Sequence, residues 1–167
     1  MIAIVDYGMG NLRSVQKALE RVGAEAVVTD DESVLDAAQG IILPGVGAFG
    51  DAMDHLRGSR LLDPVLRQVD RQKPLMGICL GMQLLFEESE EMGTHQGLGV
   101  LPGRVVRFPE GELKVPHIGW NQLQGVKGNL LEGVAEGAYA YFVHSYYVEA
   151  GEAKDVPVSY THLTLPT

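Results

Sequence analysis

The chain has 167 residues, enough for one domain with a single buried core, and its hydrophobic content of 46% argues against a disordered protein. The formal net charge of −9 argues against nucleic-acid binding and against docking on anionic lipid, because both need clustered Lys and Arg. A single cysteine excludes an intramolecular disulfide, and no apolar run reaches the ~20 residues that span a bilayer. We therefore expect a soluble, cytoplasmic protein.

The first half of the chain alternates between short apolar runs and stretches with helical spacing of apolar residues. Four such alternations are typical of an α/β fold with a parallel sheet and helices on both faces. Asn11 stands where it can cap the first helix, and Gly23 where that helix would end. The expected strands are 2–6, 26–29, 40–43 and 75–79, and the expected helices are 12–22, 31–38, 51–57, 60–72 and 80–91.

The second half reads as strands separated by Gly and Pro. We expect antiparallel strands that continue or flank the parallel sheet, at 99–102, 104–108, 114–118 and 138–148. No linker, repeat or low-complexity segment divides the chain. The sequence therefore predicts one domain over residues 1–158.

Residues 74–88 carry the most specific chemical signal. Cys79 lies between an expected strand and an expected helix, with Gly77 and Gly81 two positions before and after it. A nucleophile elbow is built in this way, and the start of a helix favours the reactive thiolate. The alternative is that this lone cysteine is a small buried hydrophobe.

Three Gly-rich segments, 6–11, 44–50 and 78–83, fall at the carboxyl ends of expected strands. In a parallel sheet these ends meet at one edge, so backbone N–H groups from all three segments can share one crevice. Segment 44–50 has an alternative interpretation as a flexible strand-to-helix turn. The absence of a GxxxxGK[ST] pattern argues against a phosphate-binding loop.

Five segments, taken in order, carry a resemblance to a known family: DYGMGNLRSV, PGVGAFGDAM, GICLGMQLLFEESEE, KVPHIGWNQL and YFVHSYYV. Together they resemble the glutaminase subunit of imidazole glycerol phosphate synthase, a class I glutamine amidotransferase of histidine biosynthesis. The resemblance implies a flavodoxin-like fold with added antiparallel strands. It also implies that glutamine is hydrolysed at the cysteine and that ammonia passes to a cyclase subunit, a (β/α)8 barrel, within a heterodimer. It implies no metal and no organic cofactor.

The resemblance also assigns roles to residues of this sequence. Cys79 is the expected nucleophile. Elbow geometry makes the N–H of Leu80 one oxyanion-hole donor, and a peptide N–H near Val46 or Gly47 would be the second. The implied glutamine-binding residues are Gln83, Glu91, Ser145 and Tyr146, and the implied contacts with the cyclase subunit are Asn11, His117, Trp120 and Asn121. For Trp120, the alternative interpretation is an ordinary core residue.

The chain also departs from this family. The FHPE-type segment that supplies the activating His and Glu is absent, and residues 159–167, SYTHLTLPT, match nothing expected there. His162 has no acid two residues on, so we reject it as the base. We expect residues 159–167 to be a non-native tail, the alternative being a divergent natural C-terminus, and we expect little or no glutaminase activity.

Two rival interpretations stay open at this point. The first is another class I amidotransferase, or an elbow-type peptidase or hydrolase. The second is a non-catalytic partner protein that kept the fold and lost the chemistry. The missing His–Glu pair favours the second, whereas the intact elbow around Cys79 argues against it.

Overall fold

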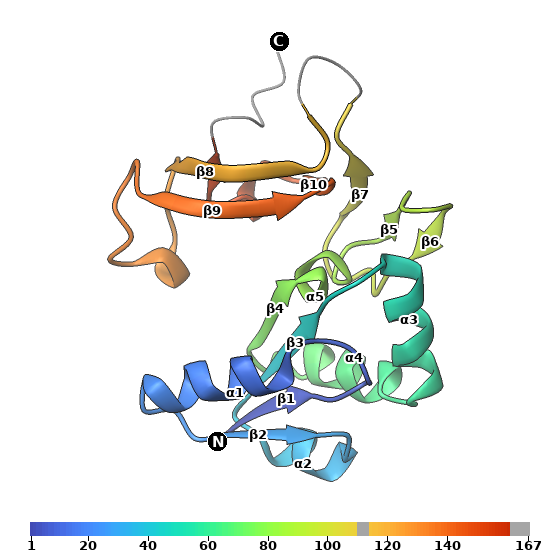
Figure 1. Cartoon of the computed structure of the whole chain (residues 1–167). Coiled ribbons are helices and arrows are strands. Elements are labelled where there is room, and N and C mark those ends of the chain that lie inside the picture. The colour runs from blue at the N-terminus through green and yellow to red at the C-terminus, as the bar shows by residue number, and fades with distance from the viewer. Residues whose placement is uncertain (110–113, 161–167) are drawn as a thin grey trace.

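The computed structural model describes residues 1–109 and 114–160, and Figure 1 shows a parallel sheet with helices below a set of antiparallel strands. The parallel sheet has the order β2-β1-β3-β4. The alternation expected from the sequence is confirmed throughout this half. Its elements are β1 (Ile2–Val5), α1 (Leu12–Arg21), β2 (Ala26–Thr29), α2 (Glu32–Ala37), β3 (Gly40–Gly45), α3 (Phe49–Gly58), α4 (Leu62–Asp70), β4 (Leu75–Cys79) and α5 (Leu80–Gln83).

The main core lies between one face of this sheet and helices α2, α3 and α4. Alternate residues of a strand face the same side, and Val5 and Leu43 send fully buried side chains into this core. The same buried cluster includes Leu35 of α2, Leu56 of α3 and Val65 of α4, all of them also fully buried. Helix α1 contributes no buried residue and packs against β1 and β2. The sheet thereby holds the carboxyl ends of β1, β3 and β4 in fixed register.

The second half forms two further sheets, with orders β10-β7-β5-β6 and β11-β8-β9. All their pairings are antiparallel except that of β5 with β7. In Figure 1 the β8–β9 hairpin lies apart from the parallel sheet, with β10 and β7 beside it. The elements are β5 (Glu88–Ser89), β6 (His95–Gln96), β7 (Gly103–Arg107), β8 (His117–Gln124), β9 (Tyr139–His144), β10 (Tyr146–Ala150) and β11 (Ser159–Tyr160), with 3-10 turns at Asn129–Leu131 and Ala153–Asp155.

The expected helix over 80–91 is wrong beyond its first turn. Helix α5 ends at Gln83, and the acidic segment 87–91 contains strand β5 instead of continuing the helix. Glu87 accepts a hydrogen bond from the N–H of Gly103, and Glu90 accepts one from the N–H of Arg107. These long-range partners of the carboxylates outweigh local helix propensity.

Three of the expected strands in the second half also need correction. The one expected at 114–118 begins only at His117 and continues to Gln124. Residues 99–102 do not form a strand. Positions 100–102 are bends, and the N–H groups of Val100 and Leu101 both bond to the carbonyl of Leu85. The run 138–148 is divided at Ser145 into β9 and β10, which pair with different strands.

Strand β11 begins at the first residue of the expected tail. Ser159 and Tyr160 pair with Gln124 and Leu123 of β8, and Tyr160 is only 7% exposed. The non-native origin of residues 159–167 stays a prediction, and His162 lies outside the described residues. None of the helices in the described part of the chain has the length and apolarity needed to cross a membrane.

Candidate active site

Cys79 stands at a strained turn between β4 and α5. Its backbone has φ 56° and ψ −119°, a region that a residue with a side chain rarely adopts, and its side chain is exposed. The exposure rules out the interpretation of Cys79 as a buried hydrophobe. Strain of this kind, at an exposed potential nucleophile, is a mark of functional sites. The elbow predicted from the sequence is therefore present.

The two glycines of the elbow are required by close backbone contacts. A Cβ atom on Gly81 would lie 1.9 Å from the carbonyl oxygen of Leu43, and one on Gly77 would lie 2.4 Å from the Cα of Met82. Real Cβ atoms essentially never come within 3.0 Å of such atoms. The absence of side chains at these positions lets α5 start directly against β3 and β4 and leaves Cys79 at the apex.

The 44–47 segment runs beside the elbow. In the parallel register of β3 and β4, Pro44 is opposite Ile78 and Gly45 is opposite Cys79. Val46 and Gly47 follow directly, both of them exposed, and Gly47 has φ 92°. Leu80, the first residue of α5, is 3% exposed. The structure thus brings together the cysteine and both segments predicted to supply oxyanion-hole donors.

Two side chains from distant parts of the sequence bind backbone groups at the start of the 44–47 segment and just beyond its end. The hydroxyl of Tyr7 donates to the carbonyl of Pro44 at 2.7 Å, and Glu91 Oε2 accepts from the N–H of Phe49 at 2.8 Å. Phe49 is the first residue of α3, whose N-cap Ala48 makes no side-chain hydrogen bond, so the carboxylate of Glu91 replaces the missing cap. The sequence interpretation missed Tyr7, although it noted the segment around it.

Burial raises the pKa of Tyr7 to about 12. The phenol therefore keeps its proton at neutral pH and remains a hydrogen-bond donor. Gly10, three residues on, also belongs to this contact, since a Cβ there would lie 3.1 Å from the Cβ of Pro44. The predicted meeting of the Gly-rich segments at one sheet edge is confirmed for all three.

Of the four residues implied to bind glutamine, Gln83 and Tyr146 are in direct contact. Gln83 Nε2 donates to the carbonyl of Tyr146 at 3.4 Å, and His144 Nδ1 lies 2.8 Å from the same carbonyl. Ser145 precedes Tyr146 at the break between β9 and β10, and its carbonyl accepts from the N–H of Phe108. Glu91 instead contacts Phe49, at the end of the 44–47 segment. Their role in binding glutamine stays a prediction.

The residues implied to contact a partner lie on different faces. Asn11 is exposed and accepts from the N–H of Ser14 at 3.2 Å, which confirms it as the cap of α1. Trp120 is 67% exposed, so the interpretation of it as ordinary core is wrong. His117 and Asn121 point to the other side of β8, where they contact each other and Asn121 is buried.

The outer face of the β8–β9 hairpin is apolar. Ile118 pairs with Val143 and Trp120 pairs with Tyr141, and the side chains of these four residues are between 54% and 67% exposed. The rings of Trp120 and Tyr141 meet edge to face with centroids 5.5 Å apart. Contiguous exposed apolar surface of this kind marks an interaction site. We call these four residues the hairpin face.

The inner side of the same hairpin holds an aromatic cluster that the sequence did not predict. Tyr160 stacks on Phe142 with ring centroids 4.0 Å apart, and its hydroxyl lies 2.5 Å from His144 Nε2. Burial raises the pKa of Tyr160. His144, through its other nitrogen, reaches the carbonyl of Tyr146. The cluster therefore joins β11 and β9 to the strand that carries Tyr146.

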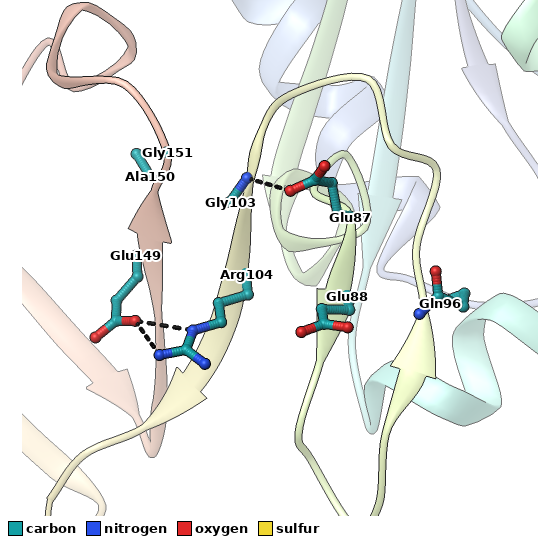
Figure 2. A pocket seen from close by; sticks show the side chains of 8 residues that line it. All are labelled: Glu87, Glu88, Gln96, Gly103, Arg104, Glu149, Ala150 and Gly151. Atoms are coloured by element: carbon teal, nitrogen blue, oxygen red, sulfur yellow. Dashed lines mark hydrogen bonds and ion pairs between the residues drawn. The ribbon is translucent and has the colours of Figure 1, made fainter.

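A separate surface hollow of about 570 Å³ opens between β5, β7 and β10 (Figure 2). Arg104 and Glu149 form an ion pair at its wall, and Glu87 holds the N–H of Gly103. None of the predicted site residues lines this hollow. Over residues 1–109 and 114–160, no three His, Cys, Asp or Glu side chains are grouped so that they could hold a metal ion.

The family model of class I glutamine amidotransferases matches residues 3–164. Several curated proteins called imidazole glycerol phosphate synthase subunit HisH are similar to the chain. That of Syntrophotalea carbinolica is 55% identical over 163 residues, which cover 93% of this chain and 79% of the relative. That of Geobacillus thermodenitrificans is 56% identical over 165 residues, which cover 95% and 77%.

Solved structures show the same fold at lower identity. A crystal structure described as a glutamine amidotransferase has a TM-score of 0.68 at 23% identity. The match covers 89% of this chain and 73% of the solved chain. PurLQS from Thermotoga maritima has a TM-score of 0.67 at 24% identity, and covers 95% and 73%. The predicted fold class, with its parallel sheet, flanking helices and added antiparallel strands, is thereby confirmed.

Proposed function

The chain belongs to the class I glutamine amidotransferases and, among them, to the HisH subunits of imidazole glycerol phosphate synthase, and from this premise we propose that its site hydrolyses glutamine at Cys79. The observation that carries the proposal is the strained, exposed thiol of Cys79 beside the Gly45–Gly47 backbone. In the overall reaction, glutamine and water give glutamate and ammonia.

In the first step, the thiolate of Cys79 adds to the carbon of the side-chain amide, and the carbonyl oxygen becomes negative. The proton that the thiol gave up goes to the amide nitrogen, so collapse of this adduct breaks the C–N bond, expels neutral ammonia and forms a thioester. Water then attacks the thioester and releases glutamate and the thiol. Covalent catalysis of this kind divides one difficult hydrolysis into two easier steps.

The negative oxygen needs donors that are aimed at it before the reaction begins. We propose the N–H of Leu80 as one donor and a peptide N–H at Val46 or Gly47 as the other. Two observations support this arrangement: Gly45 is opposite Cys79 in the sheet, and Gly47 has the left-handed φ of 92° that a turning peptide needs. Gln83, Glu91, Ser145 and Tyr146 would hold the rest of the glutamine.

We propose that the ammonia is passed to a cyclase subunit, a (β/α)8 barrel, in a heterodimer that serves histidine biosynthesis. Trp120 is the best-placed contact for such a partner, since it is 67% exposed on the apolar hairpin face. Asn11 is exposed as well, whereas Asn121 is 3% exposed and would act by supporting the strand. A cytoplasmic location fits this chemistry, because a reducing compartment keeps the nucleophilic thiol free.

No metal and no organic cofactor is needed for this reaction. Rapid turnover also needs a base that activates the thiol. Across residues 1–109 and 114–160, Cys79 makes no side-chain hydrogen bond, and His144 is held by Tyr146 and Tyr160. We therefore propose that the 167-residue polypeptide turns over glutamine slowly, since losing one member of a catalytic triad costs about ten-thousand-fold in well-studied hydrolases.

Two measurements test these proposals. The first is alkylation of Cys79 by a diazoketone analogue of glutamine, which should be prevented by glutamine and absent in Cys79→Ser. Labelling that glutamine does not slow would refute the glutamine site and favour a non-catalytic partner protein. The second is ammonia release with and without the cyclase subunit. Rapid release by the 167-residue polypeptide would refute the proposed slow turnover and leave the glutamine site intact.

A further inference from the structure

We propose that Tyr7 is a positioning residue for the oxyanion loop, which we define as residues 45–48. Its phenol fixes the carbonyl of Pro44, at the start of the loop, and leaves the peptide between Val46 and Gly47 free to turn. This inference rests on the proposed glutaminase function and adds a residue that the sequence interpretation did not include.

The contact between Tyr7 and Pro44 is buried and spans the sheet edge. Tyr7 is 2% exposed and lies beyond β1, while Pro44 lies in β3, 37 positions later. A buried hydroxyl with a partner at 2.7 Å is held tightly, because the carbonyl would otherwise lose a partner where water is excluded. The hydrogen bond therefore fixes the end of β3 at the point where the chain leaves the sheet.

The position of Pro44 governs that of the oxyanion loop. Pro44 is opposite Ile78 and Gly45 is opposite Cys79, so a shift of the Pro44 carbonyl moves the first loop residue relative to the thiol. A Cβ on Gly45 would lie 2.6 Å from the N–H nitrogen of Gly81. The loop therefore begins in close contact with the elbow helix, where small displacements change the aim of its donors.

The far end of the oxyanion loop is held as well. Glu91 Oε2 accepts from the N–H of Phe49 at 2.8 Å, directly after Ala48. Between these two anchors, Val46 is 50% exposed and Gly47 is exposed with a left-handed φ. The arrangement is a short flexible segment with two fixed ends. Loss of the Tyr7 anchor would let the loop sample positions in which its donors miss the developing oxyanion.

The variant Tyr7→Phe removes the donor and keeps the ring. Two rates of Cys79 alkylation are measured on the full chain. The diazoketone analogue of glutamine places its ketone oxygen where the amide oxygen would lie, whereas iodoacetamide reports only the exposure and acidity of the thiol. We expect the glutamine-protected diazoketone rate to fall about three- to tenfold, the effect of one neutral hydrogen bond, and the iodoacetamide rate to stay within about twofold.

The matched control is Tyr147→Phe, which removes a hydroxyl whose contact is Glu149 at 3.5 Å. It should leave both rates unchanged. Tyr7→p-aminophenylalanine keeps a donor at the same place and should restore the diazoketone rate. An unchanged diazoketone rate in Tyr7→Phe would overturn the proposal, and so would an equal loss of both rates or an unfolded variant, since these would assign Tyr7 a general structural role. If the unmodified chain shows no glutamine-protected labelling, the proposed function fails and this inference fails with it.

Discussion

Gly81→Ala tests whether the elbow depends on close backbone contact between α5 and β3. The new Cβ would lie 1.9 Å from the carbonyl oxygen of Leu43 and 3.0 Å from the carbonyl carbon of Pro44. The first distance is about 1.5 Å shorter than the ordinary contact that begins at 3.4 Å. Both groups are backbone atoms of the sheet, so neither a side-chain rotation nor a small local shift can relieve the clash.

The expected cost is at the upper end of the range for overpacking, about 3 kcal/mol of unfolding free energy. With a urea m-value of about 2 kcal/mol/M, the midpoint should fall by about 1.5 M. The assay is urea unfolding followed by circular dichroism. Alkylation of Cys79 by the diazoketone analogue should also slow, because α5 can no longer start against β3.

Gly58→Ala is the matched control. Gly58 is the last residue of α3, and a Cβ there would meet nothing within 4 Å. Alanine in a helix is favoured over glycine by about 0.5–1 kcal/mol, so this variant should be at least as stable as the unmodified chain. A Gly81→Ala variant with an unchanged midpoint and an unchanged alkylation rate would refute the description of the elbow given above.

Three further predictions concern single side chains. Burial raises the pKa of Tyr7 from 10.0 to about 12, so as the pH rises the phenol loses its proton first in the unfolded chain. The stabilisation linked to this shift is complete below pH 10, and the unfolding free energy falls between pH 10 and 12. Tyr7→Phe should flatten that slope in urea titrations. Trp120→Ala should change the unfolding free energy by no more than about 0.5 kcal/mol, because the indole is exposed, and should weaken cyclase binding about tenfold or more by calorimetry; equal binding would contradict the hairpin-face assignment. Asn11→Ala should lower the unfolding free energy by about 1 kcal/mol through loss of the α1 cap, and an unchanged urea midpoint would contradict that role.

The first half of the fold could be predicted because its signals are local. Apolar runs of four to six residues and helical spacing between them determine strand and helix, and caps such as Asn11 and Asp31 act within three residues. The second half is harder to predict from sequence because its interactions join distant residues. Residues 87–91 have strong helix propensity, yet their carboxylates accept hydrogen bonds from Phe49, Gly103 and Arg107, and no local pattern reveals these partners.

The candidate site divides in the same way. The spacing of Gly77, Cys79 and Gly81 predicted the elbow, because the strain that it needs is confined to a few consecutive residues. The exposure of Trp120 could not be settled from the alternation along β8, since either face of a strand can be the buried one. Position 120 faces outward because the inner side is taken by His117, which stacks on Tyr160, and by the buried Asn121.

The order of residues is enough to predict the parallel α/β half, the cysteine at its bend and the resemblance to a family. The folded chain is needed to see that Tyr7 and Glu91 hold the two ends of the oxyanion loop, and that β8 and β9 form a separate sheet with an apolar outer face. The reason is the separation along the sequence between the residues that interact. Backbone strain and helix capping act between neighbours in sequence, whereas a hydrogen bond across 37 or 42 positions exists only once the whole sheet has assembled.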